Sequence, residues 1–249
     1  MLELTLDTTV DITTSAIRHG AGLFETIRIQ RGMPCHLELH LERLAAGCVF
    51  LGLEPPPKAS QVRDFLLVHG VGIDLDYGAL RLVAVDGKLF LFASYLPPRS
   101  PHPVTLGRSQ GTIRFSGNPL NRFKTLSYLE NHRLAKEAHE RGLFEVIALN
   151  ERNALTDGGR TSLFASISGQ VFTPPASDGA LPGIARRVLL EGGWAEEASL
   201  RWEDLARADG VFLANALRGI IPVSEIEGHG TRIPEHPFLI KAVQLLEEK

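Results

Sequence analysis

The sequence contains few cysteines and no long apolar run. Only Cys35 and Cys48 occur among 249 residues, which favours a reducing compartment over a fold held together by disulfides. No run of about 18 apolar residues is present, and Glu3 and Asp7 interrupt the beginning of the chain, so we expect neither a membrane span nor a secretion signal. The net charge is −3 and the basic residues are scattered. We therefore expect a cytoplasmic protein without a nucleic-acid or membrane partner.

Lysine is also scarce, with six residues against 20 arginines. Five of them stand in contexts typical of solvent-exposed side chains: Lys58, Lys88, Lys136, Lys241 and Lys249. Lys124 instead stands just before a predicted helix, in Asn-Arg-Phe-Lys-Thr-Leu-Ser-Tyr-Leu-Glu-Asn. An amine in suitable surroundings can form a Schiff base with a carbonyl cofactor. The alternative is an ordinary surface lysine.

In the first part of the chain, alternating apolar and polar residues predict a strand over Leu23 to Gln30. Helical periodicity predicts helices over residues 36–51 and 59–69. Asp86-Gly87 is a strong turn signal and predicts a hairpin of strands 80–86 and 88–95. The proline-rich residues 96–103 fit neither a helix nor a strand, so we expect a domain boundary there.

In the second part, Ser127 with Glu130 resembles a capping box and predicts a helix that extends to about Arg141. Strands are expected at 144–149, 162–168 and 211–214, and helices at 183–191 and 235–248. Helices and strands are mixed without strict alternation, which predicts an α+β or irregular α/β fold. We expect a smaller N-terminal domain over residues 1–103 and a larger C-terminal domain over 104–249 that carries Lys124.

The predicted helix 36–51 has a second face, opposite its leucines, that carries His36, His40 and Arg43. The His-x-x-x-His spacing can bind a metal, but no third ligand follows, so we expect no metal site. A solvated helix face is one explanation of this pattern. The other is that Arg43 donates a fork of hydrogen bonds to a phosphate or a carboxylate.

Three further segments could contact a charged ligand. Leu181 to Ala185 leads into a predicted helix, whose first N–H groups favour an anion, and Ala214 to Gly219 follows a strand with small residues. Each segment could equally be a plain turn. Asp157, followed by two glycines, is either part of a polar turn or a carboxylate that keeps a basic ring nitrogen protonated.

Taken in order, these segments resemble the fold-type IV pyridoxal-phosphate (PLP) enzymes, which include branched-chain and D-amino acid aminotransferases and aminodeoxychorismate lyase. The resemblance implies a homodimer of two-domain subunits with the cofactor in the cleft between the domains. The matching stretches are residues 19–28, 40–44, 124–131, 155–158 with 162–164, 173–175, 181–186, and 215–219 with 222–223.

The resemblance also implies roles for individual residues. Lys124 would form the Schiff base with PLP, Asp157 would face the pyridine nitrogen, and Tyr128 would touch the cofactor. The phosphate would be bound by the side chain of Arg43 and by backbone N–H groups of Ile184, Ala185 and Ala216. The candidate substrate contacts are His19, Thr26, Arg28 and Arg218.

Four positions depart from the family pattern. The family usually has Glu at Asp157, Asn at Ser162, Thr at Ala185, and Thr or Ser at Ala216. Each hydroxyl contact with the phosphate that is missing costs roughly 1.5–3 kcal/mol. We therefore expect weaker cofactor binding than is usual for the family.

Within the family, the short chain and the segment Asn215-Ala-Leu favour 4-amino-4-deoxychorismate lyase, which releases pyruvate and forms 4-aminobenzoate for folate synthesis. The alternative is an aminotransferase that acts on D- or branched-chain amino acids. A third possibility is a homologue without catalytic activity, because of the four departures.

Overall fold

The computed structural model describes residues 1–97 and 104–231 and contains two compact units. The first unit comprises Met1–Arg99 together with Phe123–Tyr128, and the second comprises Ser100–Arg122 and Leu129–Lys249. The domain boundary predicted at residue 103 and the helix predicted at 235–248 lie outside the described residues. Lys124 belongs by its contacts to the first unit, because its segment pairs with a strand of that unit.

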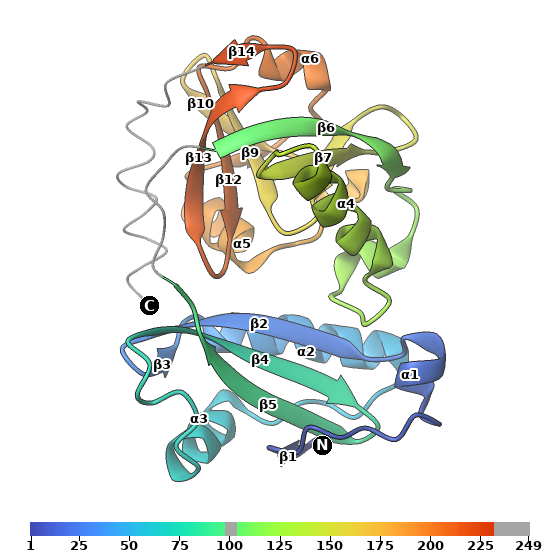
Figure 1. Ribbon diagram of the computed structural model, residues 1–249, viewed down its shortest axis with the longest axis vertical. Helices are drawn as coiled ribbons and strands as arrows, with labels where there is room; N and C mark the ends of the chain where they lie inside the picture. Colours follow the sequence, from blue (N-terminus) through green and yellow to red (C-terminus); the bar gives the residue numbers. More distant parts are fainter. Residues whose placement is uncertain (98–103, 232–249) are drawn as a thin grey trace. The chain divides into compact units, whose positions relative to one another are not determined.

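The first unit is a five-stranded sheet with helices (Figure 1). Its strands, in the order β1-β5-β4-β2-β3, are antiparallel except for the β1–β5 pair. In chain order the elements are β1 (Glu3–Thr5), α1 (Ser15–His19), β2 (Leu23–Gln30), β3 (Met33–Pro34), α2 (Leu37–Leu51), α3 (Ala59–Val68), β4 (Tyr77–Val85) and β5 (Lys88–Tyr95).

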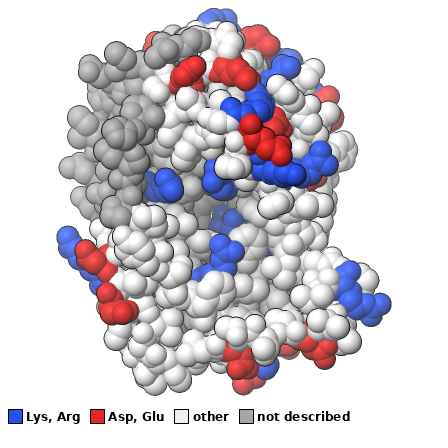
Figure 2. Space-filling view, in the orientation of Figure 1, with Lys and Arg blue, Asp and Glu red and all other residues white. Residues whose placement is uncertain are grey.

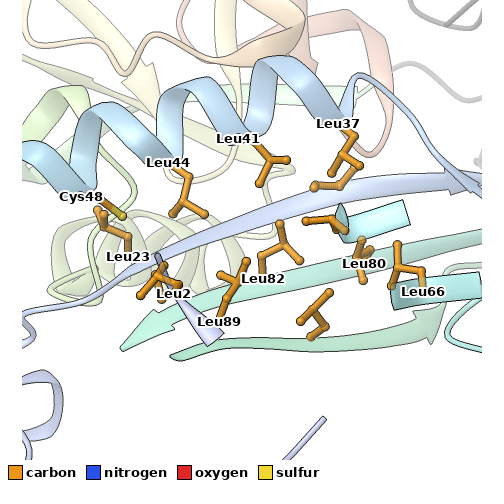
Figure 3. Close-up of a cluster of buried hydrophobic side chains, with 14 of the residues drawn as sticks. Leu2, Leu23, Leu37, Leu41, Leu44, Cys48, Leu66, Leu80, Leu82 and Leu89 are labelled. Carbon is orange, nitrogen blue, oxygen red and sulfur yellow. The ribbon is translucent and has the colours of Figure 1, made fainter. Parts of the chain in front are cut away.

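Leucines fill the core between α2 and this sheet (Figure 3). Leu37, Leu41 and Leu44 recur on one stripe of α2 and are buried against the sheet. The strands contribute every second residue, such as Leu80 and Leu82 of β4. One face of the sheet is therefore covered by α2, and the residues at alternate positions point to the other face.

The second unit is built on a nine-stranded mixed sheet. The strand order is β11-β10-β9-β12-β13-β6-β7-β8, with β14 paired to β13. The strands are β6 (Val104–Ile113), β7 (Glu145–Leu149), β8 (Leu155–Gly158), β9 (Ser162–Ile167), β10 (Gln170–Thr173), β11 (Glu196–Glu197), β12 (Gly210–Asn215), β13 (Gly219–Ile226) and β14 (Gly230–Thr231). The helices are η1 (Pro119–Arg122), α4 (Leu129–Glu140), η2 (Ala176–Asp178), α5 (Ile184–Glu191) and α6 (Trp202–Leu205).

The helices of the second unit lie against the sheet in two places. Helix α4 packs on β6 and β7, and α5 packs on β12 (Figure 1). On the face shown in Figure 2, acidic and basic side chains of this unit are interspersed. Among the described residues, no helix has both the length and the apolar character needed to cross a bilayer.

The predicted α+β fold with two units of mixed structure is confirmed. The strand predicted over Leu23 to Gln30 agrees with β2 residue for residue. The predicted hairpin is also confirmed, and Asp86 and Gly87 at its turn both have positive φ, as a two-residue turn of this kind requires. Helix α4 begins at Leu129, two residues after Ser127 of the predicted capping box, and the hydroxyl of Ser127 donates a hydrogen bond to the carbonyl of His19 over 3.4 Å.

Candidate active site

The backbone of Lys124 is fixed at the edge of the first sheet. The N–H of Phe24 in β2 donates to the carbonyl of Lys124 over 2.8 Å, and the N–H of Leu126 donates to the carbonyl of Gly22 over 2.9 Å. Leu23 and Thr125 form an antiparallel bridge between these two bonds. Lys124 is therefore positioned by strand-like pairing, although α4 begins only five residues later.

The side chain of Lys124 lies between aromatic rings. It is half-buried, with its Nζ 4.5 Å from the ring centre of Phe24 and 4.7 Å from that of Tyr128. The same nitrogen donates to the hydroxyl of Tyr128 over 3.1 Å. The two rings meet edge to face, with their centres 4.9 Å apart. The amine of Lys124 is thus held by the hydroxyl of Tyr128 instead of pointing into bulk water.

Arg43, the predicted phosphate ligand, forms a buried cluster with two other side chains. Its Nε and Nη2 donate to the two carboxylate oxygens of Glu25 over 2.8 and 2.7 Å. Nδ1 of His40 lies 2.7 Å from Oε2 of Glu25, and Glu25 and His40 are each only 1 % exposed. Because an ionised carboxylate only accepts hydrogen bonds, His40 donates here through Nδ1–H.

The surroundings in this cluster lower the pKa values of both Glu25 and His40. Burial alone would raise the pKa of Glu25, but the positive charge of Arg43 and the contact with His40 outweigh it and lower the pKa to about 2. Burial lowers the pKa of His40 below its usual 6.5, more than Glu25 raises it, and the charges of Arg43 and Lys124 lower it further. The cluster therefore contains an ionised Glu25 and a neutral His40 at neutral pH.

Glu25 is a site residue that the sequence interpretation missed. It stands in the buried register of β2, between Leu23 and Ile27, where an apolar residue is expected. A charged residue in that register was the available signal. The His-x-x-x-His pair has a different explanation from metal binding, since His40 binds Glu25. The described part of the chain contains no group of three or more residues that could hold a metal ion.

The predicted substrate contacts of the first unit lie near Lys124 or on β2. Thr26 and Arg28 occupy the same face of β2 as Phe24, because side chains alternate along a strand, and Arg28 is buried. Arg81 of β4 pairs directly with Thr26, and its guanidinium lies 5.5 Å from the ring centre of Phe24. Sequence interpretation did not single out Arg81. His19 is exposed at the end of α1.

Asp157 of β8 is buried in the second unit, only 4 % exposed. Its Oδ2 accepts a hydrogen bond from the N–H of Leu181 over 3.0 Å. Its Oδ1 lies 3.2 Å from Nε of Arg114, a second residue that sequence interpretation missed. The bond from Leu181 ties the carboxylate to the segment that leads into α5.

The start of α5 offers backbone donors for an anion. The capping residue Gly183 has an extended conformation and forms no side-chain cap, so the first N–H groups, including those of Ile184 and Ala185, are not satisfied by a cap. A Cβ atom on Gly183 would lie 2.9 Å from Oγ of Ser162, which explains a glycine at this close approach. A helix that begins in this way can bind a phosphate.

The turn between β12 and β13 lies at the same end of the sheet. Ala214, near the end of β12, pairs with Ser162. Ser162 is the residue whose Oγ lies close to Gly183 in space. Oδ1 of Asn215 accepts the N–H groups of Leu217 and Arg218 over 3.1 and 2.7 Å and thereby shapes the turn. Ala216 is half-buried at its tip, and Arg218 is exposed.

Comparison with known proteins decides the family. The model of the class IV amino-transferase family matches residues 22–226, which contain Lys124, the Glu25 cluster, Asp157 and the start of α5. The chain belongs to this family. Its members are PLP-dependent enzymes, and an aminotransferase of Mycobacterium tuberculosis, described as hypothetical, has been solved in a PLP-bound form; its structure is 23% identical, with a TM-score of 0.79 over 97% of this chain and 93% of the other.

Two further class IV relatives cover nearly the whole chain. A Legionella pneumophila protein, provisionally described as a 4-amino-4-deoxychorismate lyase, has a TM-score of 0.84 at 25% identity, over 99% of this chain and 98% of its own. A bifunctional aminodeoxychorismate lyase and D-amino acid transaminase of Mycobacterium tuberculosis is 25% identical over 94% of this chain and 90% of its own. These relatives include both a lyase and a transaminase activity.

The described residues fit PLP in each unit separately. The first unit supplies an amine held beside a phenol. The second supplies a buried carboxylate, a group able to pair with a ring nitrogen, and the uncapped start of a helix, a group able to bind a phosphate. The predicted site residues of the first unit are His19, Thr26, Arg28, Arg43, Lys124 and Tyr128. Those of the second unit are Asp157, Ile184, Ala185, Ala216 and Arg218.

Proposed function

We propose that this class IV enzyme is a 4-amino-4-deoxychorismate lyase that releases pyruvate and forms 4-aminobenzoate. The observation that carries the proposal is the placement of Lys124, whose amine lies beside Tyr128 and over the ring of Phe24. Arg28 and Arg81 share the face of the sheet that carries Phe24. The substrate is a ring with one amine and two carboxylates, and an aromatic wall with two guanidinium groups suits it. The match to the Legionella protein over nearly both whole chains supports the same choice.

The residues that would hold PLP come from the candidate site residues of both units. Lys124 would bind its aldehyde carbon, and Asp157 would face its ring nitrogen. The phosphate would be held by Arg43 and by the N–H groups of Ile184, Ala185 and Ala216. When bound, PLP supplies an electron sink for the bond changes in the substrate.

In the proposed reaction Lys124 moves protons. Its neutral amine takes the proton from the substrate ring carbon that carries the nitrogen, and a proton is returned to the departing enolpyruvyl group. The carbon–oxygen bond to that group breaks while the ring becomes aromatic. The products, 4-aminobenzoate and pyruvate, contain all the atoms of the substrate, so no co-reactant is needed. The hydroxyl of Tyr128 orients the lysine amine through their hydrogen bond.

The proposal is tested by measuring pyruvate released from aminodeoxychorismate by the PLP-loaded enzyme without an amino acceptor. Lys124→Ala is expected to abolish the release. Lys136→Ala is the matched control, since Lys136 is exposed on α4 and pairs only loosely with Glu140. Borohydride reduction followed by peptide mapping is expected to label Lys124 and not Lys136.

The second candidate is an aminotransferase, which the bifunctional relative of Mycobacterium tuberculosis favours. Transfer of an amino group from a D- or branched-chain amino acid to 2-oxoglutarate, without pyruvate release from aminodeoxychorismate, would replace the lyase proposal by this one. A protein that stays colourless in excess PLP and takes up no label would be a homologue without catalytic activity.

A further inference from the structure

Asp157 carries a buried charge that needs compensation within the second unit. A carboxylate that is 4 % exposed loses most of its hydration, which is costly unless opposite charge or hydrogen-bond donors replace it. Among the contacts described above, one oxygen receives the N–H of Leu181 and the other faces Nε of Arg114 at 3.2 Å. Arg114 is itself only 3 % exposed, so the two charges face each other in a poorly hydrated region.

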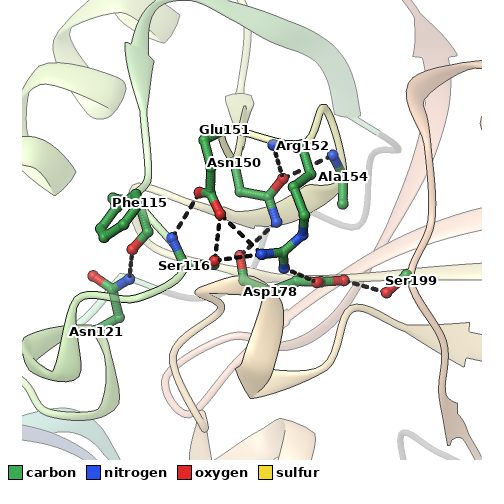
Figure 4. A network of polar contacts seen from close by, with 9 residues as sticks. All are labelled: Phe115, Ser116, Asn121, Asn150, Glu151, Arg152, Ala154, Asp178 and Ser199. Carbon is green, nitrogen blue, oxygen red and sulfur yellow. Dashed lines mark hydrogen bonds and ion pairs between the residues drawn. The ribbon is translucent and has the colours of Figure 1, made fainter.

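The segment that carries Arg114 is held firmly in place. The N–H of Arg114 donates to the carbonyl of Leu149 over 2.9 Å, and that of Ser116 donates to Oε2 of Glu151 over 2.9 Å. Arg152 extends this network by donating to Ser116 and, over 2.8 Å, to Oδ1 of Asp178 (Figure 4). These bonds fix the backbone at Arg114 and two residues further along, at Ser116.

A glycine lies beside the side chain of Arg114. Gly179 has a φ of +102°, and a Cβ atom there would lie 3.5 Å from Cγ of Arg114 and 3.2 Å from Nδ2 of Asn121. The positive φ favours a glycine here, and Gly179 packs against the stem of Arg114.

The contact between Arg114 and Asp157 is an ion pair rather than a forked pair of hydrogen bonds. Nε and Nη2 of Arg114 form no hydrogen bond with any part of the chain that the structure describes. A carboxylate has about four lone-pair positions and can accept from more than one donor. A protonated ring nitrogen is a donor of the kind that such a group accepts.

We propose that Arg114 positions Asp157 and balances its charge, and thereby limits how strongly Asp157 holds the protonated ring nitrogen of PLP. This inference rests on the proposed binding of PLP. Arg114 acts through Asp157 and is a positioning residue, not a catalytic one. Its positive charge opposes a second positive charge at the same carboxylate, so its removal favours protonated forms of the bound cofactor.

The test compares Arg114→Lys, which keeps the charge, with Arg114→Met and Arg114→Gln, which remove it. Each variant is titrated with PLP, and the visible absorbance of the bound cofactor is followed against pH. The pH at the midpoint of the absorbance change is expected to rise by about one unit in the two neutral variants. In Arg114→Lys it is expected to stay at the wild-type value. The matched control Arg152→Met removes an arginine of the supporting network whose carboxylate partners are Glu151 and Asp178. It is expected to lower the melting temperature without moving the midpoint.

The melting temperatures of the PLP-free variants test the pairing independently of the cofactor. The double variant Arg114→Met with Asp157→Asn removes both charges and is expected to melt at a higher temperature than Arg114→Met alone. If the neutral single variants fail to fold, recovery of folding in the double variant supports the inference, and equal failure of the double variant overturns it. An unchanged midpoint in neutral variants that bind PLP, or an equal rise in Arg152→Met, also overturns it. A wild-type protein that binds no PLP would instead refute the proposed function.

Discussion

The side-chain nitrogen of Lys124 lies 3.1 Å from the phenolic oxygen of Tyr128, and both residues precede α4. Their separation of four residues resembles helical spacing, but residues 124–126 pair like a strand with residues 22–24. The amine and the phenol are therefore held on the first unit by its own backbone hydrogen bonds.

Removal of the phenolic hydroxyl is predicted to slow turnover. Tyr128→Phe loses the acceptor that orients Lys124, which corresponds to about a two- to tenfold lower rate for a net hydrogen-bond contribution of about 0.5–1.5 kcal/mol. The measurement is the rate of pyruvate release at saturating PLP. Tyr95→Phe is the control, because Tyr95 is exposed at the end of β5. Equal rates in Tyr128→Phe and the wild type would show that the hydroxyl has no part in orienting the amine.

The buried Glu25 cluster predicts a loss of stability in acid. The pKa of Glu25 is about 2 when folded against 4.5 for a free side chain, so its contribution is complete above pH 4.5 and is lost as the pH falls toward 2. The pKa of His40 lies below 6.5, so a further contribution present above pH 6.5 declines as the pH falls below that value. Melting temperatures measured from pH 7 to pH 2 should show both losses.

The variant Glu25→Gln should remove most of the stability loss between pH 4.5 and pH 2, which is the one assigned to Glu25. It also leaves Arg43 without its buried counter-charge, which is predicted to cost about 3–5 kcal/mol of stability at pH 7. Glu38→Gln, which affects an exposed ion pair with Arg63, should cost less than about 1 kcal/mol. An acid profile of Glu25→Gln that parallels the wild type would contradict the assignment.

Gly158 is predicted to tolerate no side chain. A Cβ atom there would lie 2.6 Å from Cδ of the buried Glu145, which accepts the N–H groups of Gly159 and Arg160 and the hydroxyl of Thr161. Gly158→Ala should therefore lose about 1–3 kcal/mol of unfolding free energy, measured with urea, and should weaken PLP binding because Asp157 is its neighbour. At Gly111 the nearest atom would be 3.8 Å away, so Gly111→Ala provides the matched change. Similar losses at both positions would point to a general effect of alanine.

Ala216→Ser is predicted to strengthen PLP binding. The new hydroxyl at the tip of the β12–β13 turn adds a hydrogen bond to the phosphate, which can raise the affinity by about tenfold. The affinity is measured by titration of the PLP-free protein. Ala206→Ser, on the exposed end of α6, should leave it unchanged. If Ala216→Ser also leaves it unchanged, the phosphate lies elsewhere.

Local signals predicted much of this fold, and long-range contacts account for what they missed. The alternation in β2 and the Asp86-Gly87 turn depend on neighbouring residues, and both are confirmed. Strand β6 was not predicted, although residues 104–113 pair with the distant β7 and β13. Their polar and glycine content hides a strand whose partners lie far along the chain.

The candidate site shows the same division. Lys124 and Asp157 could be proposed from short motifs, and their contacts with Tyr128 and Leu181 fit those proposals. Arg114 could not, because nothing in Ile113-Arg114-Phe115 distinguishes it from an exposed arginine. Its significance depends on a carboxylate 43 residues further along the chain that the fold brings to 3.2 Å.

Because residues 123–128 belong by their contacts to the first unit while the chain on both sides belongs to the second, neither unit is a continuous stretch of sequence. An expression fragment that ends before residue 100 would lack the segment that pairs with Leu23, and with it the lysine. A single crossover with a homologue near residue 100 would combine a lysine segment from one parent with a sheet edge from the other. Exchange of a complete unit with a relative therefore needs three crossovers, one between residues 99 and 100 and one on each side of that hexapeptide.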